Sequence, residues 1–210
     1  MVEGFGAKML ADVGGHTSLT DHRIKTVEAT LAGIDESREF VAINIALLTV
    51  SDTREAHNDT SGDVLAGRID AAGHKLYERK ILPDDQVVLR KQLSAWCANP
   101  DVDVIITTGG TGVTGRDVTV EAHRALYEKE IPGFGELFRW ISFQKIGTST
   151  MQSRATAGVA NATYIFALPG STGACKDGWD DILSTQLDIR WRPCNFVELM
   201  PRLREHEKAV

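Results

Sequence analysis

The chain has 210 residues, a net charge of −6, 42% hydrophobic residues and 25% charged residues. This length and composition are typical of one globular α/β domain with a full core, and the negative charge disfavours nucleic acid and anionic membranes as partners. No apolar run is close to the length of about 20 residues that spans a bilayer. We expect a cytoplasmic protein with no membrane partner and no nucleic-acid partner. Three scattered cysteines without metal-binding spacing are expected to be reduced core or near-core residues.

Residues 1–39 carry glycines and charges without a sustained period, which predicts a flexible N-terminal arm with a weak helical signal at 19–31. The regular pattern begins at Phe40. Long apolar runs predict strands, and apolar residues at helical spacing predict helices. The expected strands are 41–50, 75–82, 104–107 and 164–168. The expected helices are 59–73, 83–97, 119–129, 134–143, 153–160 and 174–187.

Strands that alternate with helices predict a doubly wound α/β fold, in which a mostly parallel sheet carries helices on both faces. We expect a single domain at 40–200 and a polar tail at 201–210. Ligands in such folds bind beyond the carboxyl ends of the strands. Four polar or glycine-rich loops are expected to converge there on one site, and they are 51–53, 83–85, 109–117 and 169–171.

The glycine-rich stretch after the strand at 104–107 is the strongest chemical signal in the chain. Gly109, Gly110 and Gly112 surround Thr111, and glycine lets a backbone approach a phosphate closely because it has no Cβ. The stretch is neither a Walker A loop nor a dinucleotide-binding fingerprint. It is either a tight strand–helix turn without a ligand or a phosphate site formed by free backbone N–H groups.

Asp84 and Asp117 follow two of the expected strands. Each could cap the helix that comes after it. Together, on neighbouring strand ends, they suit a shared Mg²⁺ ion, which takes one or two carboxylates and completes its shell with phosphates and waters. Arg116, Arg139 and Arg154 are candidate phosphate partners, because a guanidinium group matches phosphate oxygens, although each could equally be a solvated surface residue.

Several blocks, taken together and in this order, resemble the MogA/MoaB family of molybdopterin adenylyltransferases. The matching blocks are Leu48–Asp52, Asp59–Gly62, Thr107–Gly112, Arg116–Thr119, Pro132–Glu136 with Arg139, and Leu168–Ser171. Within this family, two segments resemble the MoaB branch more than the MogA branch, and they are Ile146–Ala155 and Gln186–Phe196. The resemblance covers about Phe40–Phe196 and leaves the N-terminal arm outside.

The resemblance implies a doubly wound fold assembled as homotrimers or homohexamers. It also implies Mg²⁺-dependent transfer of AMP from ATP to the terminal phosphate of molybdopterin, with release of pyrophosphate. The family's two essential acids fall on Asp84 and Asp117, which would hold the metal on the triphosphate. Some members of the MoaB branch lack the first acid, whereas Ile81–Asp85 of this chain resembles the active MogA pattern.

Further residues are assigned to substrate binding on the same resemblance. They would bind phosphates, read the polar edges of pterin or nucleotide, or close the pocket. They are Ser51, Asp52, Thr108, Gly109, Gly110, Thr111, Gly112, Arg116, Glu136, Arg139, Ser153, Pro169, Gly170 and Ser171. Glu136 either caps its helix or points into the pocket. Two other functions remain open, namely a molybdopterin-binding oligomer that carries the pterin without adenylating it, and another enzyme built on the same domain.

Overall fold

The computed structural model describes residues 32–208, so the expected helix at 19–31 lies outside the described residues. A six-stranded sheet forms the centre of the domain, in the order β3 (Lys75–Leu82), β2 (Asn44–Val50), β4 (Val104–Thr108), β7 (Thr163–Leu168), β6 (Thr156–Ala160) and β5 (Lys129–Glu130). The first four strands are parallel, β6 runs antiparallel to β7, and β5 runs antiparallel to β6. The expectation of a mostly parallel sheet is confirmed.

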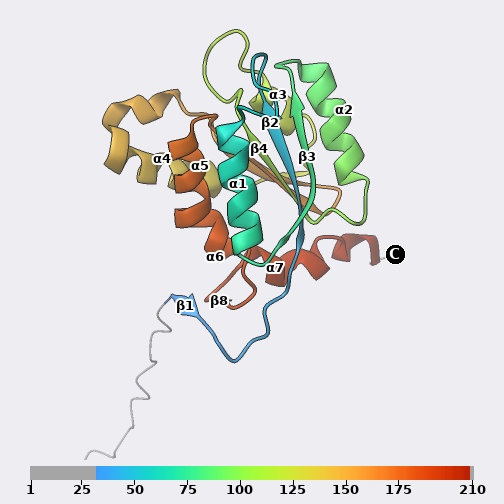
Figure 1. Cartoon of the computed structure of the whole chain (residues 1–210). Coiled ribbons are helices and arrows are strands. Elements are labelled where there is room, and N and C mark those ends of the chain that lie inside the picture. Colours follow the sequence, from blue (N-terminus) through green and yellow to red (C-terminus); the bar gives the residue numbers. More distant parts are fainter. Residues whose placement is uncertain (1–31, 209–210) are drawn as a thin grey trace, which may run out of the picture. The chain divides into compact units, whose positions relative to one another are not determined.

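Helices cover both faces of this sheet (Figure 1). One face carries α1 (Thr60–Ala71), α4 (Pro132–Ile146) and α5 (Thr172–Gly178). The other face carries α2 (Gln86–Cys97) and α3 (Thr119–Arg124). The strands β2 and β4 lie between these two helical layers, and burial on both sides explains their continuous apolar runs. The doubly wound α/β fold is therefore confirmed.

The C-terminal part of the chain continues as short elements. α5 runs through a π-helical turn, Trp179–Leu183, into α6 (Ser184–Gln186), which confirms a helical segment close to the expected 174–187. The strands β1 (Gly33–Ile34) and β8 (Trp191–Arg192) form a separate antiparallel pair. The remaining elements are α7 (Phe196–Leu199) and 3₁₀ turns at Gly147–Gln152, Met200–Arg202 and Glu205–Lys208.

The structure corrects the expected helix at 153–160, because β6 occupies most of that segment. Its five residues are all buried, and a Cβ added to Gly158 would overlap the ring of Tyr127. Gly158 therefore makes room for this ring on a strand. This is a case in which packing against a neighbour, rather than local preference, decides the backbone conformation.

Three smaller expectations also need correction. β1 lies within the range 1–39 that was assigned to the arm, so paired structure begins before Phe40. The helix expected at 119–129 ends at Arg124. Cys194 is exposed, whereas the other two cysteines are buried as expected.

None of the helices within residues 32–208 is both long and apolar enough to cross a membrane.

Candidate functional site

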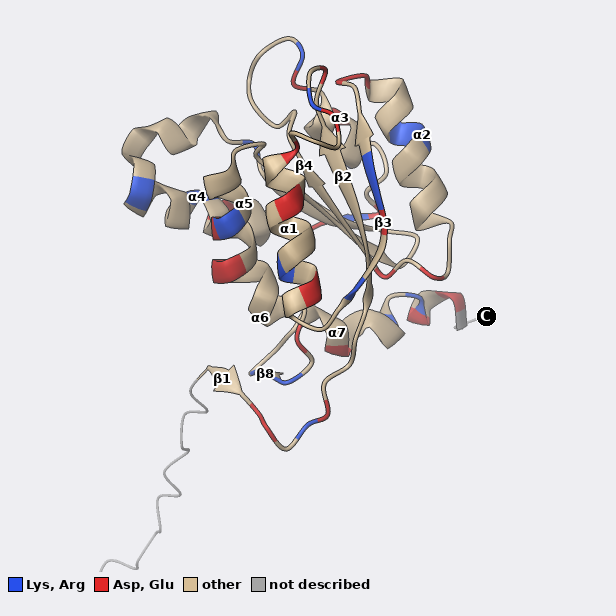
Figure 2. Ribbon diagram, in the orientation of Figure 1, with Lys and Arg blue, Asp and Glu red and all other residues tan. Residues whose placement is uncertain are grey.

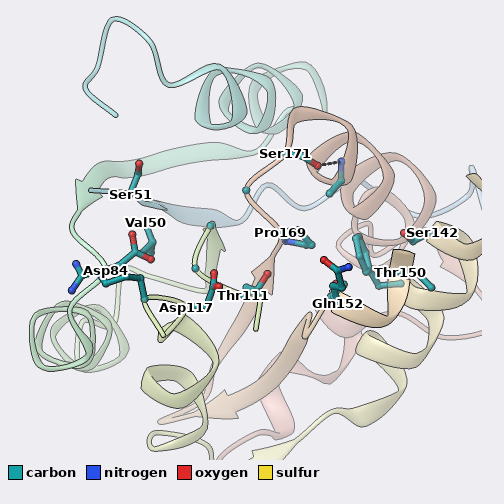
Figure 3. Close-up of a pocket in the computed structure, with 18 of the residues that line it drawn as sticks. Val50, Ser51, Asp84, Thr111, Asp117, Ser142, Thr150, Gln152, Pro169 and Ser171 are labelled. Atoms are coloured by element: carbon teal, nitrogen blue, oxygen red, sulfur yellow. Dashed lines mark hydrogen bonds between the residues drawn. The ribbon is translucent and has the colours of Figure 1, made fainter. Parts of the chain in front are cut away.

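A cavity of about 560 Å³ lies at the carboxyl ends of β2, β4 and β7, the position at which ligands bind in open parallel sheets. Its lining comes from the loops after these strands, the loop before α2, and α4 with the turn that follows it. Asp84 and Asp117 lie at one end, and Ser142, Thr150 and Gln152 lie at the other (Figure 3). The loops after β2, β3 and β4 carry charges of both signs (Figure 2). The site therefore offers a charged end and an uncharged polar end.

The glycine loop, Gly109–Gly112, lines the cavity directly after β4. Gly109 has φ +100° and Gly110 has φ +63°, values that glycine adopts without steric cost. A Cβ on Gly109 would overlap the carbonyl oxygen of Val50 at the end of β2. On the other side, a Cβ on Gly170 would lie 3.1 Å from the Cα of Gly109. These close approaches bring the ends of three strands together.

Two residues outside the glycine loop, Thr119 and Arg154, donate hydrogen bonds to its carbonyl groups. Thr119 donates to its first two carbonyls, from Oγ1 at 2.8 Å and from N at 3.0 Å. Arg154 donates to its last two, from N at 3.1 Å and from Nε at 2.6 Å. No described hydrogen bond uses the N–H groups of Gly110 or Thr111. The loop thus has fixed acceptors and two donors available for an anion.

This arrangement bears on two interpretations of the sequence. α3 begins at Thr119, as expected, and residues 113–118 separate it from the glycines, so an anion site here depends on the loop itself rather than on the helix N-terminus. Arg154 also donates to the carbonyl of Asp117 at 2.8 Å and pairs with Glu121. Its donors are therefore committed to the loop and to α3, and Arg154 is a positioning residue for the glycine loop.

Asp84 and Asp85 are neighbours at the start of α2, but only one of them caps the helix. The carboxylate of Asp85 accepts hydrogen bonds of 2.9 and 3.0 Å from two N–H groups of the first turn. Asp84 lines the cavity instead, and a Cβ on Gly110 would lie 2.8 Å from its Oδ1. Burial raises the pKa of Asp84, and the carboxylates of Asp52 and Asp117 raise it further. Such an environment favours a bound cation.

Asp117 reaches the cavity from the other end of the glycine loop. A Cβ on Gly112 would lie 2.8 Å from its Oδ2, which accepts hydrogen bonds from N and Oγ1 of Thr114 at 2.8 and 2.6 Å. Burial opposes ionisation of this carboxyl, but the hydrogen bonds from Thr114 and the N–H of Gly112 keep its pKa below the ordinary value. α3 has Val118 at its N-cap without a side-chain bond. Asp117 is therefore an ionised cavity residue and not a helix cap.

Asp52 and Thr108 do not line the cavity but contact its lining residues and their neighbours. Asp52 binds the guanidinium group of Arg116 at 2.7 to 3.0 Å and accepts a 3.1 Å hydrogen bond from the N–H of Asp84. The Oγ1 of buried Thr108 donates to the carbonyl of Pro169 at 3.0 Å. Both residues thereby fix the loops that carry lining residues, and neither belongs to the lining itself.

Glu136 and Arg139 on α4 do not line this cavity. They line a second cavity of about 310 Å³, to which Arg154 also contributes. Ser153 borders both cavities. The N-cap of α4 is Ile131, so Glu136 is not the helix cap. The residues that the sequence assigned to one site are therefore divided between two neighbouring cavities.

A family model described as a probable molybdopterin binding domain matches residues 46–188. The chain belongs to this family. It is 51% identical over 160 residues to the molybdenum cofactor biosynthesis protein B of Escherichia coli, an alignment that covers 76% of this chain and 94% of the relative. The resemblance drawn from the sequence blocks is confirmed by this match.

Two solved structures extend the comparison. A crystal structure of molybdenum cofactor biosynthesis protein B has a TM-score of 0.72 and 37% identity, and the alignment covers 80% of this chain and 99% of that one. The tungsten cofactor synthesizing protein MoaB from Pyrococcus furiosus has a TM-score of 0.60 and 36% identity, with 68% of this chain and 91% of that chain covered. The fold is thus shared with members of the family.

The family resemblance implies Mg²⁺. The acidic residues of the cavity fit a Mg²⁺ ion whose remaining ligands come from a bound phosphate and from water. Asp84 and Asp117 are the carboxylates in the lining. Within residues 32–208, no group of three or more His, Cys, Asp or Glu side chains is arranged to hold a metal ion. A pair of carboxylates is the usual protein contribution to a Mg²⁺ ion whose other ligands are phosphates and waters.

Sequence reasoning missed the uncharged end of the cavity and one arginine. Phe138, Ser142 and Ile146 line the cavity from a single face of α4, and their spacing of four residues is the signal that could have found them. Thr150 and Gln152 follow in the turn after α4. Arg54 lies in the loop after β2 and also lines the cavity. No motif marks it, because its contact with the carbonyl of Gly170 is distant in the sequence.

Proposed function

We propose that this protein acts in molybdenum cofactor biosynthesis as a molybdopterin adenylyltransferase. The observation that carries the proposal is that Asp84 and Asp117 come from separate loops, lie against the same glycine loop, and line one cavity without capping a helix. The name of the Escherichia coli relative supports the pathway. The family description supports molybdopterin as one of the two substrates.

The proposed reaction transfers AMP from ATP to molybdopterin. An oxygen of the terminal phosphate of molybdopterin forms a bond to the α-phosphorus of ATP. The bond from that phosphorus to the bridging oxygen of the β-phosphate breaks, and pyrophosphate leaves with the electron pair. The attacking phosphate oxygen is already anionic, so no side chain has to remove a proton. The reaction therefore depends on positioning and on neutralising charge.

The lining residues supply these functions. Mg²⁺ held by Asp84 and Asp117, together with phosphate oxygens, would provide positive charge at the triphosphate. The N–H groups of Gly110 and Thr111 would bind a phosphate oxygen, and their orientation is set in advance because the loop carbonyls are already bonded. The polar side chains at the other end would hold an edge of the pterin or of the nucleotide.

The test is pyrophosphate release from purified protein supplied with ATP, Mg²⁺ and molybdopterin. We expect release that requires the pterin and that falls at least about 100-fold in Asp117→Asn, the loss that follows removal of one strong electrostatic contact in a site of this kind. Turnover of Asp117→Asn equal to that of the wild type at saturating Mg²⁺ would contradict the metal-binding role. Tight binding of molybdopterin without pyrophosphate would instead identify a carrier.

We also propose that the protein is a homotrimer or homohexamer in which α4 contacts a second copy of the chain. α4 is uncharged over most of its visible length in Figure 2, and it is apolar on two sides. Phe134 and Phe138 face the core, while Trp140 is 65% exposed and Phe143 is 50% exposed on the outer side. Large apolar side chains that lie exposed together on one surface indicate a contact with another protein surface, and a second copy supplies an equally apolar surface.

A further inference from the structure

A buried carboxylate lies between two arginines beside the main cavity. The side chain of Asp59 is fully buried, and Oδ2 accepts hydrogen bonds of 2.7 Å from Thr49 and 2.7 Å from Arg79. Oδ1 accepts a 3.0 Å hydrogen bond from the N–H of Gly62 and lies 3.4 Å from an Nη1 of Arg54. The pKa of Asp59 is lowered, because these hydrogen bonds together outweigh the effect of burial.

The two arginines do not share this carboxylate equally. Arg79 lies at 2.7 Å from Asp59 and also pairs with exposed Asp63 at 2.7 Å. Arg54 has only the 3.4 Å contact with Asp59, and its other described hydrogen bonds go to uncharged groups, the hydroxyl of Ser61 and the carbonyl of Gly170. Asp59 is therefore bound more closely by Arg79 than by Arg54. The guanidinium group of Arg54 makes only the longer contact with this carboxylate.

Arg54 lines the cavity, and its side chain is 28% exposed. The described hydrogen bonds use Nη1 and one N–H of Nη2, and none of them uses Nε. Nε and Nη2 lie side by side on the guanidinium group, and this pair of donors can bind two oxygens of one phosphate. Arg116 is the other cationic residue in the described lining, and its Nε and Nη2 already bind Asp52.

We propose that Arg54 binds a phosphate group of the ligand in this cavity, through Nε and Nη2, while Asp59, Ser61 and Gly170 hold its guanidinium group in place. The proposal deepens the adenylyltransferase assignment and rests on it for the identity of the phosphate. ATP and molybdopterin both carry phosphate, and the guanidinium group would recognise either source.

The experiment measures binding by calorimetry in the full-length protein, with MgATP and with molybdopterin titrated separately. Arg54→Gln is expected to weaken one of the two ligands by about 10-fold or more, the size expected for loss of a charged hydrogen bond, and to reduce the salt dependence of that binding. Arg54→Lys should weaken it less, because it keeps the charge but loses the paired donors. The ligand that is weakened identifies the phosphate that Arg54 binds.

Arg79→Gln is the matched control, because Arg79 contacts the same carboxylate but does not line the cavity. It should lower thermal stability and leave both affinities within about 2-fold of wild type. If this variant does not fold, Arg79→Lys takes its place. Equal weakening by Arg54→Gln and by the Arg79 control would overturn the proposal, since the effect would then act through Asp59.

Other outcomes separate this proposal from the assignment of the reaction. If the wild type releases pyrophosphate and Arg54→Gln binds both ligands with unchanged affinity, only the role of Arg54 is overturned. Selective weakening by Arg54→Gln in a protein that releases no pyrophosphate would support Arg54 and contradict the transferase. A wild-type protein that binds neither ligand would overturn both.

Discussion

At the scale of single residues, two neighbouring aspartates at the start of α2 contribute to stability with opposite signs. Asp85 satisfies N–H groups of the first helical turn. Asp84 has a raised pKa, because it is partly buried and close to the carboxylates of Asp52 and Asp117. Above its folded-state pKa, the folded protein holds a carboxylate at a cost that the unfolded chain does not have. Asp84 therefore lowers stability at neutral pH, as expected for a residue retained for function.

We expect Asp84→Asn to raise the free energy of unfolding at pH 7 by about 0.5–2 kcal/mol, the usual gain from relieving an unfavourable charge, while it abolishes pyrophosphate release. The stability of the wild type falls as pH rises from the ordinary aspartate pKa through the raised pKa of Asp84. The advantage of the variant should therefore shrink as the pH is lowered toward 4. Urea unfolding at several pH values measures both effects.

Asp85→Ala provides the local control for this measurement. It removes the N-cap of α2 and should lower the free energy of unfolding by about 1 kcal/mol. A variant at Asp84 that is destabilised as much as Asp85→Ala would contradict the charge argument, because it would show that the carboxylate of Asp84 stabilises the fold.

At the scale of elements, the glycine loop requires glycine at position 109 both for its backbone conformation and for its close contact with the end of β2. Gly109→Ala would combine a positive φ with an overlap between Cβ and the carbonyl oxygen of Val50. We expect a loss of stability of about 1–3 kcal/mol and a large loss of ATP affinity, because the loop must move away from the end of β2. Denaturant unfolding and calorimetry with MgATP measure the two effects.

Gly115→Ala is the matched substitution in the exposed segment between the glycine loop and α3. A Cβ there meets nothing within 4 Å, and the residue has no positive φ. Its stability should stay equal to wild type or rise slightly, because alanine restricts the unfolded chain. Similar losses in both variants would mean that general stiffening of the loop, rather than the contact with Val50, is responsible.

Four of the six strands of the sheet, both helical layers and the four convergent loops could be predicted from the sequence, because apolar periodicity and glycine turns are local signals. β6 could not, since its small residues are explained only by the ring of Tyr127 above Gly158. The doublet Asp84-Asp85 showed that a helix begins there but not which carboxylate caps it. Arg54 stayed invisible because its contact with Gly170 joins residues from separate loops.

At the scale of the whole molecule, α4 lies between the main cavity and the outer surface. Its inner face supplies Phe138 and Ser142 to the lining, and Ile146 lines the cavity while remaining 56% exposed. The outer face presents Trp140 and Phe143 to solvent. A contact between copies through this helix would therefore cover an apolar surface and also support one wall of the cavity, so that assembly and ligand binding would depend on each other.

We expect the wild-type protein to have a mass of three or six times 23.0 kDa in light scattering coupled to gel filtration. Trp140→Asp should shift it toward the single-chain mass, because a charge at the centre of an apolar contact is left without a partner. Val87→Asp is the control, since Val87 is 76% exposed on α2, which packs on the opposite face of the sheet from α4, and it should leave the mass unchanged. A wild type that is monomeric, or a Trp140→Asp variant that keeps the full mass, would exclude the outer face of α4 as the contact between copies.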